Sequence, residues 1–173
     1  MIQLIPVSRA NAATFKSIRL AALQESPTAF GSKHEIESKL SDVEWLKKAD
    51  LWSNGTRSTC YLAFDGDRAC GIAAGYFPDD GTGPYLVSMW VAPTHRRRAV
   101  GHRLVEAVVA WARSRGARQL MLDVTTNNDA AIGFYEKLGF TKTGIVKPYP
   151  NDPALQEYEM RRVIESSGDR VIG

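Results

Sequence analysis

The change from a strand pattern to a helix pattern between residues 85 and 116 constrains the fold of this chain most. Tyr85–Val91 is an apolar run that ends before Pro93, which is typical of a buried strand. Three consecutive arginines follow, and from about Ala99 apolar residues recur at helical spacing until Gly116. A strand joined through a helix to a further strand, at residues 119–124, predicts a crossover and a parallel pair.

The remaining segments place this unit inside one α/β (α+β) domain with a single mixed sheet flanked by helices. Their predicted order is β-α-α-β-β-β-α-β-α-β-β. The other predicted strands are residues 2–7, 61–64, 70–77, 140–146 and 156–163, and the other predicted helices are residues 11–23, 35–51 and 130–138.

Length and composition fit one globular domain: 173 residues, 44% hydrophobic and 24% charged. We expect the domain to span residues 1–166 and residues 167–173 to form a disordered polar tail. A formal charge of +3 is too small to indicate a nucleic-acid partner. No apolar run approaches the roughly 20 residues that span a bilayer, and the N-terminus lacks a signal-peptide pattern. We therefore expect a cytoplasmic protein that binds no membrane.

The two cysteines flank a predicted hairpin turn. A two-residue loop pairs Asp65 with Arg68 and Ala63 with Cys70, which places Cys60 on the other face of the sheet. In that register the two sulfurs cannot form a disulfide. Neither has a neighbouring His or Cys, so we predict two buried thiols and no metal site.

The basic loop and the helix after it can bind an anion. The N–H groups of a helix N-terminus are unpaired, small residues at Ala99 and Gly101 let a phosphate approach them, and the arginines add charge. A solvated basic loop is the plain alternative. A nucleic-acid patch is a third, but it requires stacking aromatic residues that the linear sequence does not show nearby.

A second informative stretch begins where a helix is predicted near Asn128. Asn128, Ala131 or Ile132, and Tyr135 then lie roughly on one face and can contact one ligand. Each also has a structural interpretation, because Asn128 can be a helix N-cap and Tyr135 a core aromatic residue.

Together the two stretches resemble the GCN5-related N-acetyltransferase (GNAT) family. Its coenzyme A motif, Arg/Gln-x-x-Gly-x-Gly/Ala, corresponds here to Arg96-Arg97-Arg98-Ala99-Val100-Gly101, and its companion pattern corresponds to residues 128–140. The resemblance covers about residues 58–163. Ala99 departs from the family's Gly, and we expect it to fit with a negative φ in the first turn of the helix.

The resemblance implies that acetyl-CoA is the cofactor, that no metal takes part, and that an N–H near Met89 polarises the thioester carbonyl. The implied cofactor-binding residues are Met89, Trp90, Val91, Arg96, Arg97, Arg98, Ala99, Val100, Gly101, His102, Asn128 and Ala131.

It also implies direct transfer to a primary amine, with Tyr135 as general acid. Asp123 is the candidate base, and Glu25, Glu35 and Glu37 are its rivals. A non-catalytic acyl-CoA sensor of the same fold is the first alternative, and a nucleic-acid-binding module is the second.

Substrate choice in this family lies in the first two helices and the last hairpin. Phe30 and Tyr149 are therefore candidate walls of an acceptor pocket, or else structural residues. The acceptor is a small-molecule amine or a peptide N-terminus, and the sequence does not decide between them. A homodimer through the terminal strands is possible, with residues 156–163 as an edge strand blunted by charges.

Overall fold

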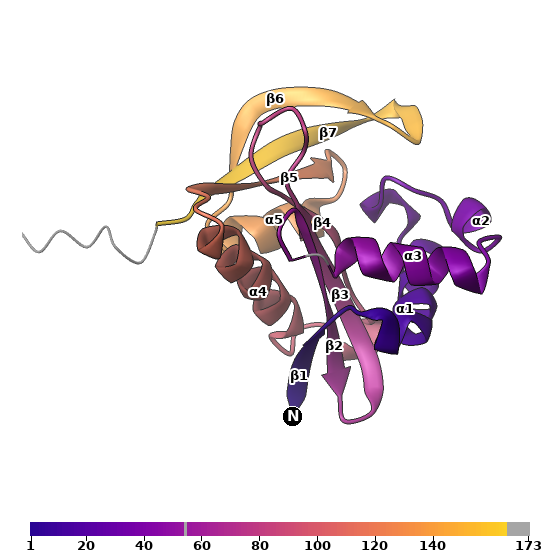
Figure 1. Cartoon of the computed structure of the whole chain (residues 1–173). Coiled ribbons are helices and arrows are strands. Elements are labelled where there is room, and N and C mark those ends of the chain that lie inside the picture. Colours follow the sequence, from indigo (N-terminus) through magenta and orange to yellow (C-terminus); the bar gives the residue numbers. More distant parts are fainter. Residues whose placement is uncertain (54, 166–173) are drawn as a thin grey trace, which may run out of the picture.

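The computed structural model describes residues 1–53 and 55–165 and contains one seven-stranded sheet in the order β1-β2-β3-β4-β5-β7-β6 (Figure 1). The α/β fold with one mixed sheet is as predicted. Residues 167–173, expected to form a tail, lie outside the described residues. The elements are β1 (Ile2–Pro6), α1 (Ala12–Glu25), α2 (His34–Glu37), α3 (Asp42–Trp52), β2 (Ser58–Asp65), β3 (Arg68–Tyr76), β4 (Tyr85–Val91), α4 (Val100–Ser114), β5 (Gln119–Thr125), α5 (Asp129–Lys137), β6 (Thr141–Tyr149) and β7 (Asp152–Val163).

The sheet is antiparallel except for β4 and β5, which the α4 crossover makes parallel, as predicted. The last hairpin corrects one expectation. β7 pairs with β5 on one side and with β6 on the other, so residues 156–163 do not form an edge. After α5, β6 takes the outer position in the sheet, and β7 then folds back into the position between β5 and β6. Within the described part of the chain, no helix has the length and apolarity needed to cross a membrane.

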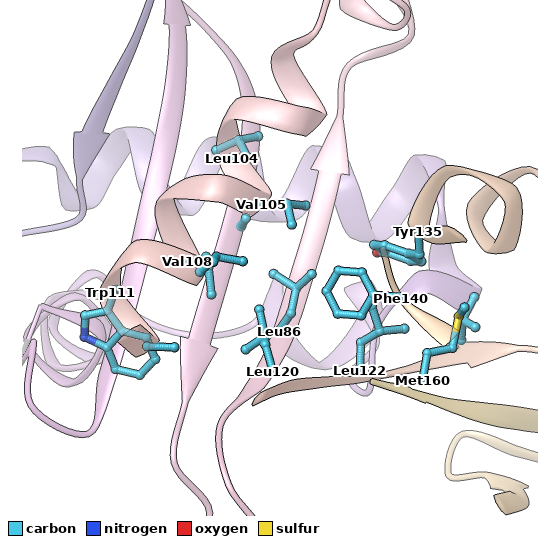
Figure 2. Close-up of a cluster of buried hydrophobic side chains, with 14 of the residues drawn as sticks. Leu86, Leu104, Val105, Val108, Trp111, Leu120, Leu122, Tyr135, Phe140 and Met160 are labelled. Carbon is cyan, nitrogen blue, oxygen red and sulfur yellow. The ribbon is translucent and has the colours of Figure 1, made fainter. Parts of the chain in front are cut away.

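α4 packs closely on one face of the sheet because β3 carries two glycines there. A Cβ at Gly75 would lie 2.7 Å from Val108 Cγ1, and one at Gly71 would lie 2.9 Å from Leu104 Cδ1. Larger residues would push the helix away and open the core. Figure 2 shows side chains of α4, β4 and β5 meeting in this core, together with Tyr135 and Phe140.

α1 and α3 cover the opposite face, where Phe15 and Trp45 meet edge to face with ring centroids 5.5 Å apart. The single helix predicted over residues 35–51 is wrong, because α2 and α3 are separate. Ser41 starts α3 with a capping box: the Glu44 N–H donates to Ser41 Oγ at 3.2 Å, and the Ser41 N–H donates to Glu44 at 2.7 Å. This reciprocal pair fixes a helix start inside the predicted helix.

The β2–β3 hairpin confirms the turn and corrects the register beyond it. Asp65 pairs with Arg68 as predicted, but a β-bulge then shifts Ala63 opposite Gly71. The conclusion about the cysteines is confirmed. Cys60 and Cys70 are buried, free, and belong to the cores on opposite faces of the sheet.

Candidate functional site

A cleft of about 1550 Å³ opens between β4 and β5. These strands pair at a single position, Tyr85 with Met121, and they diverge beyond it. The two diverging strands form a V. The Met121 N–H donates to the Pro84 carbonyl at 2.9 Å, which fixes the closed end of this V. The cleft is lined by the two strands, the N-terminal turns of α4 and α5, and residues 26 and 28–32, most of the segment called here the 26–32 loop.

A bulge in β4 turns backbone into this cleft. Ile72 pairs with Trp90 but Ala74 pairs with Val87, so Ser88 and Met89 together lie opposite a single residue of β3. Ser88 has a φ of 54°, a left-handed conformation that is uncommon for a residue with a side chain. The backbone around Met89 is therefore released from the ladder on β3, beside the cleft.

The basic loop before α4 contains two left-handed residues, Arg97 at φ 60° and Ala99 at φ 61°. The expectation of a negative φ at Ala99 is wrong, because Ala99 is the N-cap and precedes the first helical turn. A left-handed non-glycine residue costs on the order of 1 kcal/mol, and such strain is characteristic of functional loops. Arg96 and Arg97 line the cleft, whereas Arg98 does not and instead contacts Asp65 at 3.4 Å.

Gly101, in the first turn of α4, packs closely against two neighbouring side chains. A Cβ there would lie 3.0 Å from Phe134 Cζ and 3.1 Å from Met89 Cε. The N-terminal turn of α4 is thereby held against both α5 and β4. Its unpaired N–H groups lie at the open end of the V, where they can bind an anion.

Arg96 is tied to the end of β4 and to α1. Its Nε–H donates to the Val91 carbonyl at 3.0 Å, and its guanidinium donates to Glu25 at 2.8 Å. Trp90 Nε1 also donates to Glu25, at 2.7 Å. Although burial raises the pKa of Glu25, hydrogen bonds from Ser26, Trp90 and Arg96 lower it below its usual value. Glu25 is therefore held as an anion and is a weak proton acceptor.

The predicted face of α5 contains a helix N-cap, Asn128, and a buried phenol, Tyr135. Asn128 Oδ1 accepts a hydrogen bond from the Ala131 N–H at 3.1 Å, so Asn128 is an N-cap that also lines the cleft. Tyr135 lies in the core against Phe134 and Phe140 (Figure 2). Its hydroxyl hydrogen-bonds to none of the described residues, yet Tyr135 lines the cleft. Burial raises its pKa well above the usual value, so the phenol stays protonated.

Asp123 lies on β5 just past the point where the strands diverge, and it lines the cleft. Its carboxylate is 2.9 Å from Lys147 Nζ. Burial raises the pKa of Asp123, the Lys147 ammonium lowers it, and the nearby Glu159 raises it, with a net increase. A carboxylate with a raised pKa accepts a proton more readily than an exposed aspartate does.

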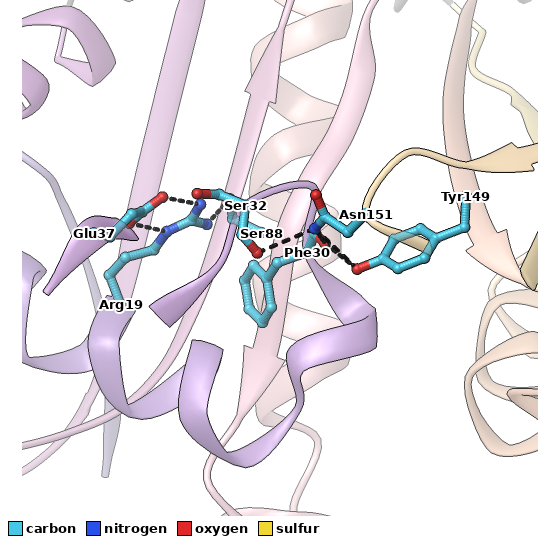
Figure 3. A network of polar contacts seen from close by, with 7 residues as sticks. All are labelled: Arg19, Phe30, Ser32, Glu37, Ser88, Tyr149 and Asn151. Atoms are coloured by element: carbon cyan, nitrogen blue, oxygen red, sulfur yellow. Dashed lines mark hydrogen bonds and ion pairs between the residues drawn. The ribbon is translucent and has the colours of Figure 1, made fainter. Parts of the chain in front are cut away.

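A buried ion pair supports the β4 bulge from the α1 side (Figure 3). Arg19 donates to Glu37 at 3.0 and 2.9 Å and to the Ser88 hydroxyl at 2.6 Å. Its guanidinium also lies 4.9 Å from the centroid of the Phe30 ring. Burial raises the pKa of Glu37, but the hydrogen bonds and charge of Arg19 lower it overall. Glu37 is therefore a structural anion, and Glu35 is exposed and does not line the cleft.

The β6–β7 turn holds the 26–32 loop in place. Tyr149 donates its hydroxyl proton to the Phe30 carbonyl at 2.6 Å, and Asn151 Nδ2 donates to the Phe30 and Ser32 carbonyls at 3.2 and 3.3 Å (Figure 3). Phe30 lines the cleft, but Tyr149 does not. Of the two roles considered for Tyr149, its contacts fit the structural one.

Residues 20–140 match the family described as Acetyltransferase (GNAT) family. The chain belongs to this family. It is 30% identical over 135 residues, 78% of this chain and 88% of the relative, to the [ribosomal protein bS18]-alanine N-acetyltransferase of Salmonella typhimurium.

Two solved structures share the GNAT fold. One is a protein of Salmonella typhimurium with its cofactor acetyl-CoA, at a TM-score of 0.74 and 16% identity, covering 96% of each chain. The other is an N-acetyltransferase of Thermoplasma acidophilum in complex with coenzyme A, also at a TM-score of 0.74 and 16% identity, covering 94% of this chain and 99% of the other. In this chain, the cleft between β4 and β5 brings together nearly all the site residues predicted from sequence. The predicted residues that line it are Phe30, Met89, Trp90, Val91, Arg96, Arg97, Ala99, Val100, Gly101, His102, Asp123, Asn128, Ala131 and Tyr135.

The residues that support this GNAT cleft were not predicted as supports from sequence, and Glu37 was considered there only as a rival base. Arg19, Glu37 and Ser88 come from separate elements, and Asn151 belongs to a turn that sequence patterns place only as a loop. The hydrogen bond from Arg19 to Ser88 joins residues 69 positions apart. No local spacing signals such a contact, because it depends on how α1 packs across the sheet.

Proposed function

We propose that this chain transfers the acetyl group of acetyl-CoA to a primary amine by direct attack, with both substrates bound in the cleft. The observation that carries the proposal is the divergence of β4 and β5 beyond Tyr85 and Met121. It opens a slot that has an anion-binding turn at one end and Asp123 at the other. Family membership supports the same activity.

The cleft suits coenzyme A. Gly101 packs against Phe134 and Met89, where an added Cβ would lie 3.0 and 3.1 Å from their side chains, so the α4 turn stays close to β4. The backbone N–H groups from Arg97 to His102 would hold the pyrophosphate, with added charge from the Arg97 side chain. The free backbone of β4 around Met89 would hold the amide-bearing arm. When bound, acetyl-CoA supplies the acetyl group as an activated thioester.

The protein's own residues then handle two protons. Asp123 accepts a proton from the attacking amine, directly or through water, because an ammonium has no lone pair with which to attack. Tyr135 donates its phenolic proton to the departing sulfur, since burial keeps the phenol protonated and no described residue competes for it. Arg19, by holding Ser88, keeps the β4 bulge and its backbone N–H groups in a fixed position.

Release of free thiol from acetyl-CoA tests this proposal across a panel of small amines and peptide N-termini. We expect thiol release that depends on the acceptor, with the acetyl group recovered on the acceptor nitrogen. Tight coenzyme A binding without thiol release for any acceptor would instead favour the non-catalytic sensor. Binding of nucleic acid alone, with an affinity that falls steeply as salt is added, would favour the nucleic-acid-binding module.

A further inference from the structure

Four charged side chains lie on the cleft face of β5, β7 and β6. Asp123 pairs across the strands with Glu159, and Glu157 pairs with both Thr125 and Lys147. Directly opposed residues point to the same face of a sheet, and so do residues two apart on one strand. This face therefore carries the carboxylates of Asp123, Glu157 and Glu159 against the single ammonium of Lys147.

One of these carboxylates, Glu157, has neither an ion pair nor a hydrogen bond with any described residue, although the charge of Lys147 opposite acts on it. Lys147 Nζ is 2.9 Å from Asp123 and 3.8 Å from Glu159. Glu159 also accepts hydrogen bonds from the Tyr85 hydroxyl at 3.3 Å and the Thr143 hydroxyl at 3.1 Å. Glu157 is half-buried and lines the cleft, yet no described residue forms an ion pair or hydrogen bond with it. Its position therefore favours a cation from outside the protein.

The residue directly opposite Glu157 carries a second unpaired group. Thr125 is only 2% exposed, and among the described residues its Oγ1 has no hydrogen-bond partner. A buried hydroxyl without a partner costs about 1–3 kcal/mol, so it calls for an explanation, such as a bound water or ligand. Thr125 lines the same cleft.

Aromatic rings line the same cleft on the Asp123 side. Tyr76 and Tyr85 line the cleft with ring centroids 6.1 Å apart, and Trp52 meets Tyr76 edge to face at 6.4 Å. Lys147 Nζ lies 5.7 Å from the Tyr85 centroid, within the range of a cation–π contact. Tyr85 therefore already faces one cation in this structure.

We propose that Glu157 and Thr125 form a subsite for a second positive charge on the acceptor. The preferred acceptor is an alkyl diamine or a larger polyamine. One nitrogen attacks beside Asp123, while the other, still an ammonium, binds Glu157 and donates to the Thr125 hydroxyl. Asp123 and Thr125 are two residues apart on β5, roughly 7 Å, which a short alkyl chain spans. This inference rests on the proposed function and names its substrate class.

The test compares 1,4-diaminobutane with 1-aminobutane, which differ by the second amine. With the wild-type enzyme and acetyl-CoA, we expect kcat/KM from thiol release to favour the diamine at least tenfold. Calorimetry without acetyl-CoA, in the presence of coenzyme A, should show the same order of affinity. Glu157→Gln should bring the ratio of the two kcat/KM values close to one, mainly by raising KM for the diamine. Glu157→Asp, which keeps the charge, should retain part of the preference.

Glu35→Gln is the matched control, because Glu35 is exposed and does not line the cleft, so it should keep the wild-type ratio. Thermal melting confirms that each variant is folded. Equal or weaker use and binding of the diamine by the wild-type enzyme would overturn the subsite. A preference that survives Glu157→Gln would overturn the role of Glu157. Absence of transfer to every amine tested would instead overturn the proposed acetyltransferase function.

Discussion

The two ends of the cleft are built in opposite ways. The cationic end, around Arg96 and Arg97, comes from consecutive residues at one helix N-terminus. The acidic end comes from four strands, with Tyr85 on β4, Asp123 on β5, Lys147 on β6 and Glu157 on β7. A site made by local backbone can be predicted from a motif. A site made by strand register appears only once the sheet order is known.

The largest effect should come from removing the carboxylate at the acidic end. Asp123→Asn should lower kcat/KM by roughly 10³-fold, within the usual range for general base catalysis. In the wild type, activity should fall as pH drops through the pKa of Asp123, which burial raises above the value of an ordinary aspartate. Because Lys147 lowers that pKa, Lys147→Met should move this acidic limb to higher pH. A pH–rate profile that keeps the limb in Asp123→Asn would assign the base elsewhere.

Between the two ends, Tyr135→Phe should lower kcat by roughly 10²-fold, because a thiol is a fairly good leaving group. KM for acetyl-CoA should change much less, since the lost interaction belongs to the transition state. Steady-state kinetics measure both values. Tyr158→Phe is the control, because Tyr158 does not line the cleft. An unchanged kcat in Tyr135→Phe would leave Tyr135 with its packing role alone.

The difference between the local cationic end and the multi-strand acidic end also decides which features could be predicted from sequence. The residues proposed to bind phosphate came from the basic loop and its resemblance to the family motif. Hydrophobic periodicity predicted the order of the strands along the chain and the parallel β4–β5 pair. It did not predict that β7 lies between β5 and β6, because a hairpin can add its strands in either order. Glu157 was therefore missed, since it looked like an edge residue. The φ of Ala99 was also missed, because the motif shows the residue type and not the turn before the helix.

At the cationic end, two neighbouring arginines provide a matched comparison. Arg97 lines the cleft, and Arg98 points to Asp65 instead. Arg97→Ala should weaken coenzyme A binding about tenfold, or about 1.4 kcal/mol. Arg98→Ala should weaken it less than about twofold, since a distant exposed charge is screened by salt. Calorimetry at fixed ionic strength measures both affinities. Equal losses would mean that the loop acts through its total charge and not through its geometry.

The smallest effect concerns the strain stored in the same turn. Ala99→Gly relieves a left-handed alanine, partly offset by the greater freedom of glycine in the unfolded chain. We expect a net gain of about 0.5 kcal/mol, seen as a rise in Tm of about 1–2 °C. Ala110→Gly, at an exposed position inside α4, should have the opposite sign and cost about 1 kcal/mol. A destabilised Ala99→Gly variant would contradict the left-handed conformation.

The central claim is that one cleft joins acetyl-CoA at its cationic end to an amine at its acidic end. The most direct measurement incubates the wild-type protein with acetyl-CoA and each amine of the panel, 1,4-diaminobutane among them, and follows thiol release and acceptor mass together. We predict release of one thiol for each acceptor molecule that gains one acetyl group. Thiol release without acetylated acceptor, at the rate seen with no amine present, would contradict the account.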